Sequence, residues 1–381
     1  MMRAAGAHSA LLPLLLVMVT VTWCSRLVPR RSEVVPLCDR VCEGPLVPCE
    51  RGTADHQDHI HYRPRRPLPV SRSSCGRVRG LTSRQRRFCR RHPDLLQALL
   101  SGYQLGASDC RHRFRLHRWN CAALGRHLDF GHVQVRGTRE AAVMYALQSA
   151  AVTHSLYAAC RRGTVEGCAC RRPGPDTRAV DFWKWSGCGE GLSHSGRQAR
   201  RFLNARETEG DARSLMNRHN NRAGVKAVTG GRRRRCHCHG PSGSCSLRTC
   251  WMDAPSSFSV IGDRLQQQLD SSQLVHLVQL PTGKRRLRAV EGDLTERLER
   301  RRLVHLEPSP TYCDPDPERG HNGTVGRVCR KNRSLPGSCE YMCCGRGYNI
   351  QITYRRYCCN FHQRPGRPTE CRQRTRLRKC Q

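Results

Sequence analysis

The stretch CHCHGPSGSCSLRTCW, from Cys236 to Trp251, holds four cysteines, two histidines and three serines directly after four consecutive arginines. This composition is compatible with a metal site, a nucleophilic serine, a nucleic-acid-binding knuckle or a disulfide-clamped loop. Zinc sites usually place two cysteines as C-x2–4-C and follow them with a second pair of ligands. Because Cys236 and Cys238 are spaced C-x-C, with a histidine after each, the pattern argues against a metal site.

The serine at position 242 lies between two glycines, as a nucleophile does in the G-x-S-x-G motif of serine hydrolases. Here the last position of that motif is Ser244 and not glycine. The motif also normally follows a hydrophobic strand, whereas residues 232–239 read RRRRCHCH. The sequence therefore argues against a hydrolase that uses Ser242, and we expect neither a catalytic residue nor an enzymatic activity.

Disulfide formation is the fourth interpretation, and four cysteines allow three pairings. A bond between Cys236 and Cys238 would be strained, because their side chains would point the same way on a strand but lie too far apart. A nested pairing suits a hairpin whose returning strand bulges or turns: it joins Cys236 to Cys250 and Cys238 to Cys245. The residues thus favour a rigid hairpin that presents Ser242 in the loop HGPSGS.

The first 24 residues combine an early arginine with an apolar run from Leu11 to Val21. This pattern predicts a secretory signal peptide, because the run is shorter than the roughly 20 apolar residues that span a bilayer. The chain has 25 cysteines, so removal of Cys24 with the signal would leave an even number. Secretion into an oxidising compartment therefore predicts a disulfide framework, which would support a core with few aromatic residues.

The chain carries 67 lysines and arginines against 30 aspartates and glutamates, a formal net charge of +37. A charge of this size attracts dense polyanions. Secretion argues against nucleic acid as the partner. It favours heparan sulfate or anionic lipid headgroups, in the extracellular space and matrix.

Helical signals fill residues 75–262, after an extended arm over residues 25–74 that is rich in proline and arginine. Thr82 and Gln85 have capping-box spacing, Pro93 favours a helix start, and Thr138 is a candidate cap. Further helices are expected over 195–207 and 214–228.

The amino-acid composition changes after residue 262. Residues 263–312 are highly charged and predict an exposed linker. Residues 313–381 hold nine cysteines and few apolar residues, so disulfides should hold their strands. We expect a mainly α N-terminal domain with a disulfide-clamped β-hairpin at 236–251. A small disulfide-rich β-hairpin domain, cytokine-like or cystine-knot-like, should follow.

The opening stretch resembles the signature of the Wnt family, C-K-C-H-G-x-S-G-S-C followed by K-T-C-W. Other segments resemble the family in the same order, from about residue 75 to the C-terminus. They are DCRHRFRLHRWNC at 109–121, GTREAAVMYA at 137–146, WKWSGC at 183–188, FLNARE at 202–207, LMNRHNNRAG at 215–224 and CCGRGYN at 343–349.

The resemblance implies a secreted, lipid-modified glycoprotein that activates Frizzled receptors in development and cell-fate control. It implies a palmitoleoyl ester on Ser242, added by the acyltransferase Porcupine, and no other cofactor. It also implies a Wnt carrier during secretion and a co-receptor related to the low-density-lipoprotein receptor. The Frizzled cysteine-rich domain would contact the hairpin tip and a second site: Gly240, Pro241, Ser242, Gly243, Phe361 and His362. N-glycans are expected at Asn322 and Asn332.

The resemblance also implies most of the disulfide pattern. The expected pairs are Cys75–Cys89, Cys110–Cys121, Cys160–Cys168, Cys170–Cys188, Cys313–Cys344, Cys329–Cys339, Cys343–Cys380 and Cys358–Cys371.

The C-terminal tip departs from the family pattern. Phe361 and His362 match it, but Gln363 to Pro368 replace a tryptophan and a vicinal cysteine pair. This departure motivates an alternative, a glycan-binding decoy that does not signal.

Overall fold

The computed structural model describes residues 71–121, 124, 136–168, 189–246, 248–255, 257–291, 297–317, 321–359 and 369–381. Contacts divide the chain into two units. One unit contains Ile352–Arg376, and the other contains residues 57–351 together with 377–381. The expected signal peptide and residues 25–70 of the expected N-terminal arm lie outside the described residues. No helix in the described part of the chain is long and apolar enough to cross a membrane.

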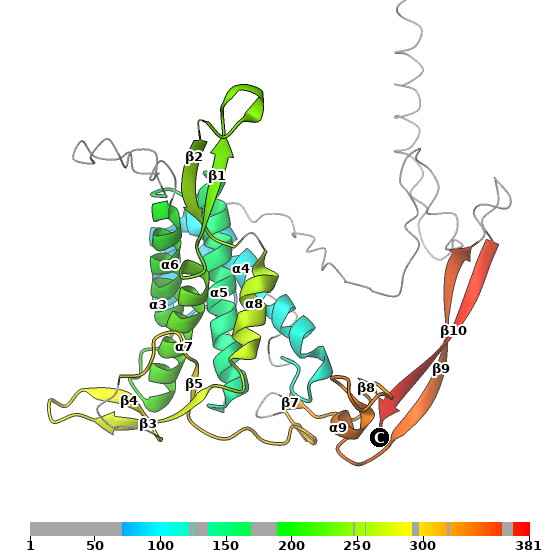
Figure 1. Cartoon of the computed structure of the whole chain (residues 1–381). Helices are drawn as coiled ribbons and strands as arrows, with labels where there is room; N and C mark the ends of the chain where they lie inside the picture. Colours follow the sequence, from blue (N-terminus) through cyan, green and yellow to red (C-terminus); the bar gives the residue numbers. More distant parts are fainter. Residues whose placement is uncertain are drawn as a thin grey trace, which may run out of the picture. The chain divides into compact units, whose positions relative to one another are not determined.

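Helices dominate the region between residues 74 and 267 (Figure 1). Short 3-10 turns lie at η2 (Pro93–Leu95), η3 (Phe114–Leu116) and η5 (Pro241–Gly243). The α-helices there are α2 (Ser74–Arg77), α3 (Ser83–Arg91), α4 (Leu96–Arg113), α5 (Arg139–Arg161), α6 (Gly189–Asn204), α7 (Ala212–Thr229) and α8 (Phe258–Gln267).

Three expected helix starts are confirmed, whereas α6 begins at Gly189, before the expected residue 195. Thr82 and Gln85 form a reciprocal capping box before α3. The Thr138 side chain caps α5 by accepting a hydrogen bond from the backbone N–H of Ala141. Pro93 begins a 3-10 turn that continues into α4, as expected for a residue without a backbone N–H.

Helix α5 packs against α4, α6, α7 and α8. Its buried face is rich in alanine, which lets neighbouring backbones approach closely. Gly224 on α7 shows how closely: a Cβ there would overlap the carbonyl oxygen of Ala146 and lie 3.0 Å from its Cα. Large side chains such as Phe114, Leu147 and Met216 complete this core.

The prediction that residues 263–312 form an exposed linker is wrong. Residues 263–312 contain the end of α8 and a three-stranded sheet of order β4-β3-β5, made of β3 (Gln273–Gln279), β4 (Arg285–Ala289) and β5 (Val304–His305). Leu265, Val275 and Leu303 are buried in the helical core. The buried Asn220 side chain ties β5 to α7 through hydrogen bonds to both backbone groups of Val304, at 2.9 and 3.0 Å.

Strands and disulfides form the C-terminal region, as expected, and two of these strands are 12 residues long. Its elements are β6 (Pro315–Asp316), β7 (His321–Asn322), β8 (Val328–Cys329), α9 (Cys339–Met342), β9 (Tyr348–Cys359) and β10 (Thr369–Cys380). The bonds Cys313–Cys344, Cys329–Cys339 and Cys343–Cys380 are present. A cystine-knot-like arrangement stays a prediction.

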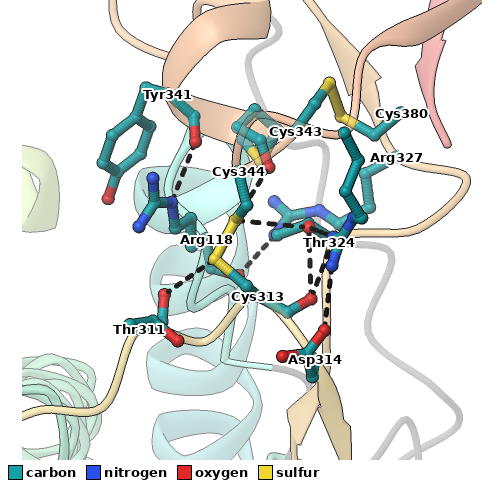
Figure 2. Close-up of a disulfide and its surroundings, with 12 residues drawn as sticks. Arg118, Thr311, Cys313, Asp314, Thr324, Arg327, Tyr341, Cys343, Cys344 and Cys380 are labelled. Atoms are coloured by element: carbon teal, nitrogen blue, oxygen red, sulfur yellow. Dashed lines mark hydrogen bonds and ion pairs between the residues drawn. A yellow bond between two sulfur atoms is a disulfide. The ribbon is translucent and has the colours of Figure 1, made fainter.

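Arginine side chains join this region to the helical region around the Cys313–Cys344 disulfide (Figure 2). Arg118, just after η3, donates to the carbonyl oxygen of Tyr341 at 2.9 Å and lies over its ring, 4.3 Å from the centroid. Arg327 reaches in the opposite direction and donates to the carbonyl oxygens of Arg115 and Arg118. Residues distant in sequence are thereby held together at this junction.

Candidate functional site

The serine-bearing stretch forms an antiparallel hairpin that projects beyond the ends of helices α5 and α6 (Figure 1). Its strands are β1 (Arg233–Cys238) and β2 (Arg248–Asp253). The inner bond Cys238–Cys245 is present. Cys236 is disulfide-bonded, and the residue opposite it in the register is Cys250. The hairpin is thus clamped directly below its loop.

Ser242 lies at the tip of this loop in a left-handed backbone conformation, with φ 55° and ψ 25°. Backbone hydrogen bonds fix the turn: Gly243 N–H donates to Gly240 O, and Ser244 N–H donates to Pro241 O, each at 3.0 Å. Gly240 suits this turn, because a Cβ there would lie 2.6 Å from the backbone carbonyl oxygen of Ser244 and would also overlap the hydroxyls of Ser244 and Ser246. The sequence PSG at the tip is therefore held in one shape and stays exposed.

The Ser242 hydroxyl has no hydrogen-bond partner among the described residues. A serine nucleophile needs an adjacent general base that accepts its proton. The described part of the chain therefore offers an open hydroxyl at the tip and no activated nucleophile.

The base of the hairpin is anchored on a buried carboxylate. Asp253 ends β2 with a side chain 2% exposed, and it accepts a hydrogen bond from the Tyr157 hydroxyl on α5 at 2.8 Å. Arg161 on α5 and Arg235 on β1 each approach its second oxygen at 3.5 Å. That oxygen has no hydrogen bond, so these two contacts are ion pairs without hydrogen-bond geometry.

This anchor changes the chemistry of Tyr157. Burial, followed by the hydrogen bond and the charge of Asp253, raises the pKa of Tyr157 to about 12. The phenol therefore stays protonated at neutral pH and donates to the carboxylate. Both strands of the hairpin are in this way tied to the central helix.

The sequence did not single out Asp253, Tyr157, Arg118 or Arg327. Asp253 follows the signature by two residues, and its isolated negative charge at a strand end was the available indication. The partners of Arg118 and Arg327 are backbone carbonyls of distant residues, which no local pattern specifies.

Other expected site residues are placed only in part. Asn322 and Asn332 are both exposed. Phe361 and His362 lie outside the described residues, as does the pair Cys170–Cys188. The side chains of Cys358 and Cys371 are likewise outside the described part. The remaining expected bonds are present in the helical region: Cys75–Cys89, Cys110–Cys121 and Cys160–Cys168.

A helical region that carries a clamped, exposed serine loop defines a disulfide-stabilised protein with a projecting hairpin. Residues 77–381 match the model of the Wnt family. Protein Wnt-2 of Drosophila melanogaster is 41% identical over 310 residues, 75% of this chain and 87% of that protein. The chain therefore belongs to the Wnt family of secreted developmental signalling ligands, and it is not an enzyme.

A solved structure supports the fold. The structure of human WLS in complex with WNT8A contains a chain that is 29% identical, with a TM-score of 0.53. The match covers 74% of this chain and 93% of that chain. It agrees with the helix-rich N-terminal region and the disulfide-rich C-terminal region.

Proposed function

We propose that this protein is a lipid-modified ligand of Frizzled receptors and that Ser242 carries a palmitoleoyl ester. The observation that supports the proposal most is the placement of Ser242. Its hydroxyl is exposed, without a partner among the described residues, at the tip of a loop closed by the Cys238–Cys245 bond. An acyltransferase can reach such a hydroxyl, and a receptor groove can take the chain that it bears.

The modification is an acyl transfer that we assign to Porcupine, with an acyl thioester as donor. Ser242 Oγ attacks the thioester carbonyl, the new C–O bond forms, and the C–S bond breaks. The hydroxyl proton leaves with the thiol. The protein has to present the hydroxyl and need not supply a base, which agrees with the open loop.

The energetic consequence is large. Each buried methylene contributes about 0.8 kcal/mol, so complete burial of about 15 chain carbons is worth roughly 12 kcal/mol. Even a fraction of this value would dominate an interface with the Frizzled cysteine-rich domain. The same chain would need a carrier during secretion. WLS holds WNT8A in the solved complex, and we propose a carrier of that kind for this protein.

The remaining partners follow from the same proposal. A co-receptor related to the low-density-lipoprotein receptor would complete the signalling complex. The net charge of +37 favours retention on heparan sulfate in the extracellular matrix. Glycans would occupy Asn322 and Asn332. Thr324, the third residue of the Asn322 acceptor triplet, is buried in the folded protein, so transfer to Asn322 would precede folding there.

Metabolic labelling with an alkyne-bearing palmitoleate analogue tests the proposal. Wild-type protein and Ser244→Ala should incorporate the label, because Ser244 is an exposed neighbour in the same loop. Ser242→Ala should not. Equal labelling of wild type and Ser242→Ala would overturn the assignment. Binding of the labelled protein to Frizzled ectodomains would distinguish a signalling ligand from the glycan-binding decoy.

A further inference from the structure

A pocket of about 340 Å³ lies between the N-terminal half of α7 and strand β4, and it is lined by six arginines. We call it the arginine pocket, defined by Arg218, Arg222, Arg285, Arg286, Arg288 and Arg297. Its other described lining residues include no carboxylate. Asp293 and Glu296, near in sequence, lie outside the described residues. The pocket is therefore a concentration of positive charge within a basic chain.

Most guanidinium groups of this pocket lack a carboxylate partner among the described residues. Elsewhere, arginines such as Arg113 and Arg136 form ion pairs with aspartate or glutamate. Within the described residues, no carboxylate forms an ion pair with five of the six arginines that line the pocket, all except Arg288. Like charges held together in this way repel one another and oppose folding, and a bound polyanion would offset the repulsion.

Burial and neighbouring positive charges both disfavour the charged form of Arg222 in the pocket. Burial, followed by the charges of Arg200, Arg300 and Arg218, lowers the pKa of Arg222. Arginine nevertheless stays protonated at neutral pH. The side chain is thus available as a charged, planar donor.

The spacing of the arginines suits a repeating anion. Arg218 and Arg222 are four residues apart on α7, so their Cβ atoms are about 6 Å apart on one face. Arg286 and Arg288 are two residues apart on β4 and share a face of the strand, at a spacing of about 7 Å. Two rows of forked donors match a linear polymer that carries several sulfate groups, because guanidinium binds such oxyanions through paired hydrogen bonds.

The position of the pocket separates it from the hairpin. Helix α7 ends at Thr229, shortly before β1, whereas the pocket is lined by residues 215–222, further from the hairpin along the helix. Figure 1 shows the β3–β4 strands at the end of the helices opposite the tip of the β1–β2 hairpin. A membrane that received an acyl chain at the tip would lie away from the pocket. This arrangement disfavours a lipid headgroup as its ligand.

We propose that the arginine pocket binds the clustered sulfate groups of a sulfated polysaccharide chain. This inference rests on the sulfated-glycan partner of the proposed function and gives that partner a site. It does not depend on acylation of Ser242, so a bound glycan and an acyl chain at the tip could be present together.

The test uses the full-length secreted protein and an immobilised, highly sulfated heparin octasaccharide at physiological salt. The pocket variant carries Arg218→Gln, Arg222→Gln and Arg286→Gln. The matched control carries Arg72→Gln, Arg77→Gln and Arg79→Gln, three exposed arginines outside the pocket with the same loss of charge. We expect the pocket variant to bind at least about tenfold more weakly, because the loss of a single charge-assisted contact already corresponds to that factor. The control should lose roughly threefold at most.

Equal weakening of both variants would overturn the proposal, because it would show that only net charge matters. Equal or tighter binding of a polyglutamate peptide, or of phosphatidylserine vesicles, with the same dependence on the three pocket arginines would also overturn it. A second variant with the three arginines changed to lysine keeps the charge and the fold, and it should show an intermediate loss. Full affinity in this lysine variant would contradict recognition by forked donors.

Ser242→Ala separates the two proposals. It should bind the octasaccharide with wild-type affinity, whether or not the labelling experiment supports acylation. Loss of octasaccharide binding in Ser242→Ala would contradict the separation of the pocket from the hairpin.

Discussion

At the scale of single residues, the buried carboxylate of Asp253 decides how the hairpin is held. A buried charge is stable only when it is paired and hydrogen-bonded. Asp253 meets this condition through the Tyr157 hydroxyl and two arginines that are about half exposed. The arginines can find water if the carboxylate is lost, whereas the phenol cannot, because Tyr157 is buried.

Tyr157→Phe removes the hydrogen bond to this carboxylate and leaves the rest of the site in place. We expect the free energy of unfolding to fall by about 1–3 kcal/mol, the cost of leaving a buried charged group without a donor. Hydrogen exchange should also accelerate in β1 and β2, because the hairpin loses its tie to α5. Urea unfolding and exchange mass spectrometry measure the two effects. Unchanged exchange in the hairpin would contradict the anchoring role.

The same tyrosine predicts a dependence on alkaline pH. Its pKa is raised to about 12 in the folded protein, against an ordinary value of 10.0. The folded state therefore holds the phenolic proton more tightly than the unfolded state. The advantage of wild type over Tyr157→Phe is fully present below pH 10 and is lost as the pH rises towards 12. Unfolding free energies of wild type and Tyr157→Phe, measured from about pH 10 to about pH 12, test this prediction. A difference between the two proteins that grows as the pH rises would contradict it.

At the scale of secondary structure elements, close helix contacts explain the small residues of α5 and α7. Ala in place of Gly inside a helix normally stabilises it by about 1 kcal/mol. At Gly224 the new Cβ would overlap Ala146, so Gly224→Ala should destabilise the protein by about 1–3 kcal/mol. Gly76→Ala is the matched control, because a Cβ there meets nothing within 4 Å. The midpoint temperature of thermal unfolding should fall for Gly224→Ala, whereas it should rise or stay unchanged for Gly76→Ala.

The sheet that replaces the expected linker makes a second prediction at this scale. Leu303 is fully buried against the helical core, so Leu303→Ala should cost about 2–5 kcal/mol of unfolding free energy. Leu277→Ala is the same change at a side chain that is 37% exposed on β3, and it should cost about 1 kcal/mol or less. Similar small losses at both positions would support a linker and contradict the sheet.

Local signals were sufficient for α3, α4 and α5 and for the hairpin, but they did not indicate α8. Thr82, Pro93 and Thr138 act through neighbours in sequence, so their roles could be predicted from spacing alone. The sheet could not, because β3 buries a single residue, Val275, among exposed and half-buried residues and lacks clear alternation. Its place depends on the side chain of Asn220, which lies more than 80 residues from Val304. Because residues 263–312 are rich in charged side chains, no local pattern indicated these few long-range contacts.

At the scale of the whole molecule, two kinds of core stabilise the chain. The helical region buries large apolar side chains such as Leu99, Phe114 and Phe202. The buried cluster of the C-terminal region consists of four cysteines and Met342. Burial of apolar area therefore stabilises the helices, whereas the C-terminal region depends on its disulfides to restrict the unfolded chain.

This difference predicts the order in which a thiol reductant opens the protein. Residues 313–351 and 377–381 should lose protection against hydrogen exchange first, because cleavage of Cys329–Cys339 and Cys343–Cys380 leaves them only a small apolar cluster. Helix α5 should keep its protection longer, since its buried face packs against four other helices. Exchange mass spectrometry after graded reduction and alkylation follows both regions in one sample, with unreduced protein as the control. Simultaneous loss of protection in α5 and the C-terminal region would contradict this order and would show that the two regions unfold as one cooperative unit. In that case the hydrogen bonds of Arg118 and Arg327 to backbone carbonyl oxygens would couple the two cores.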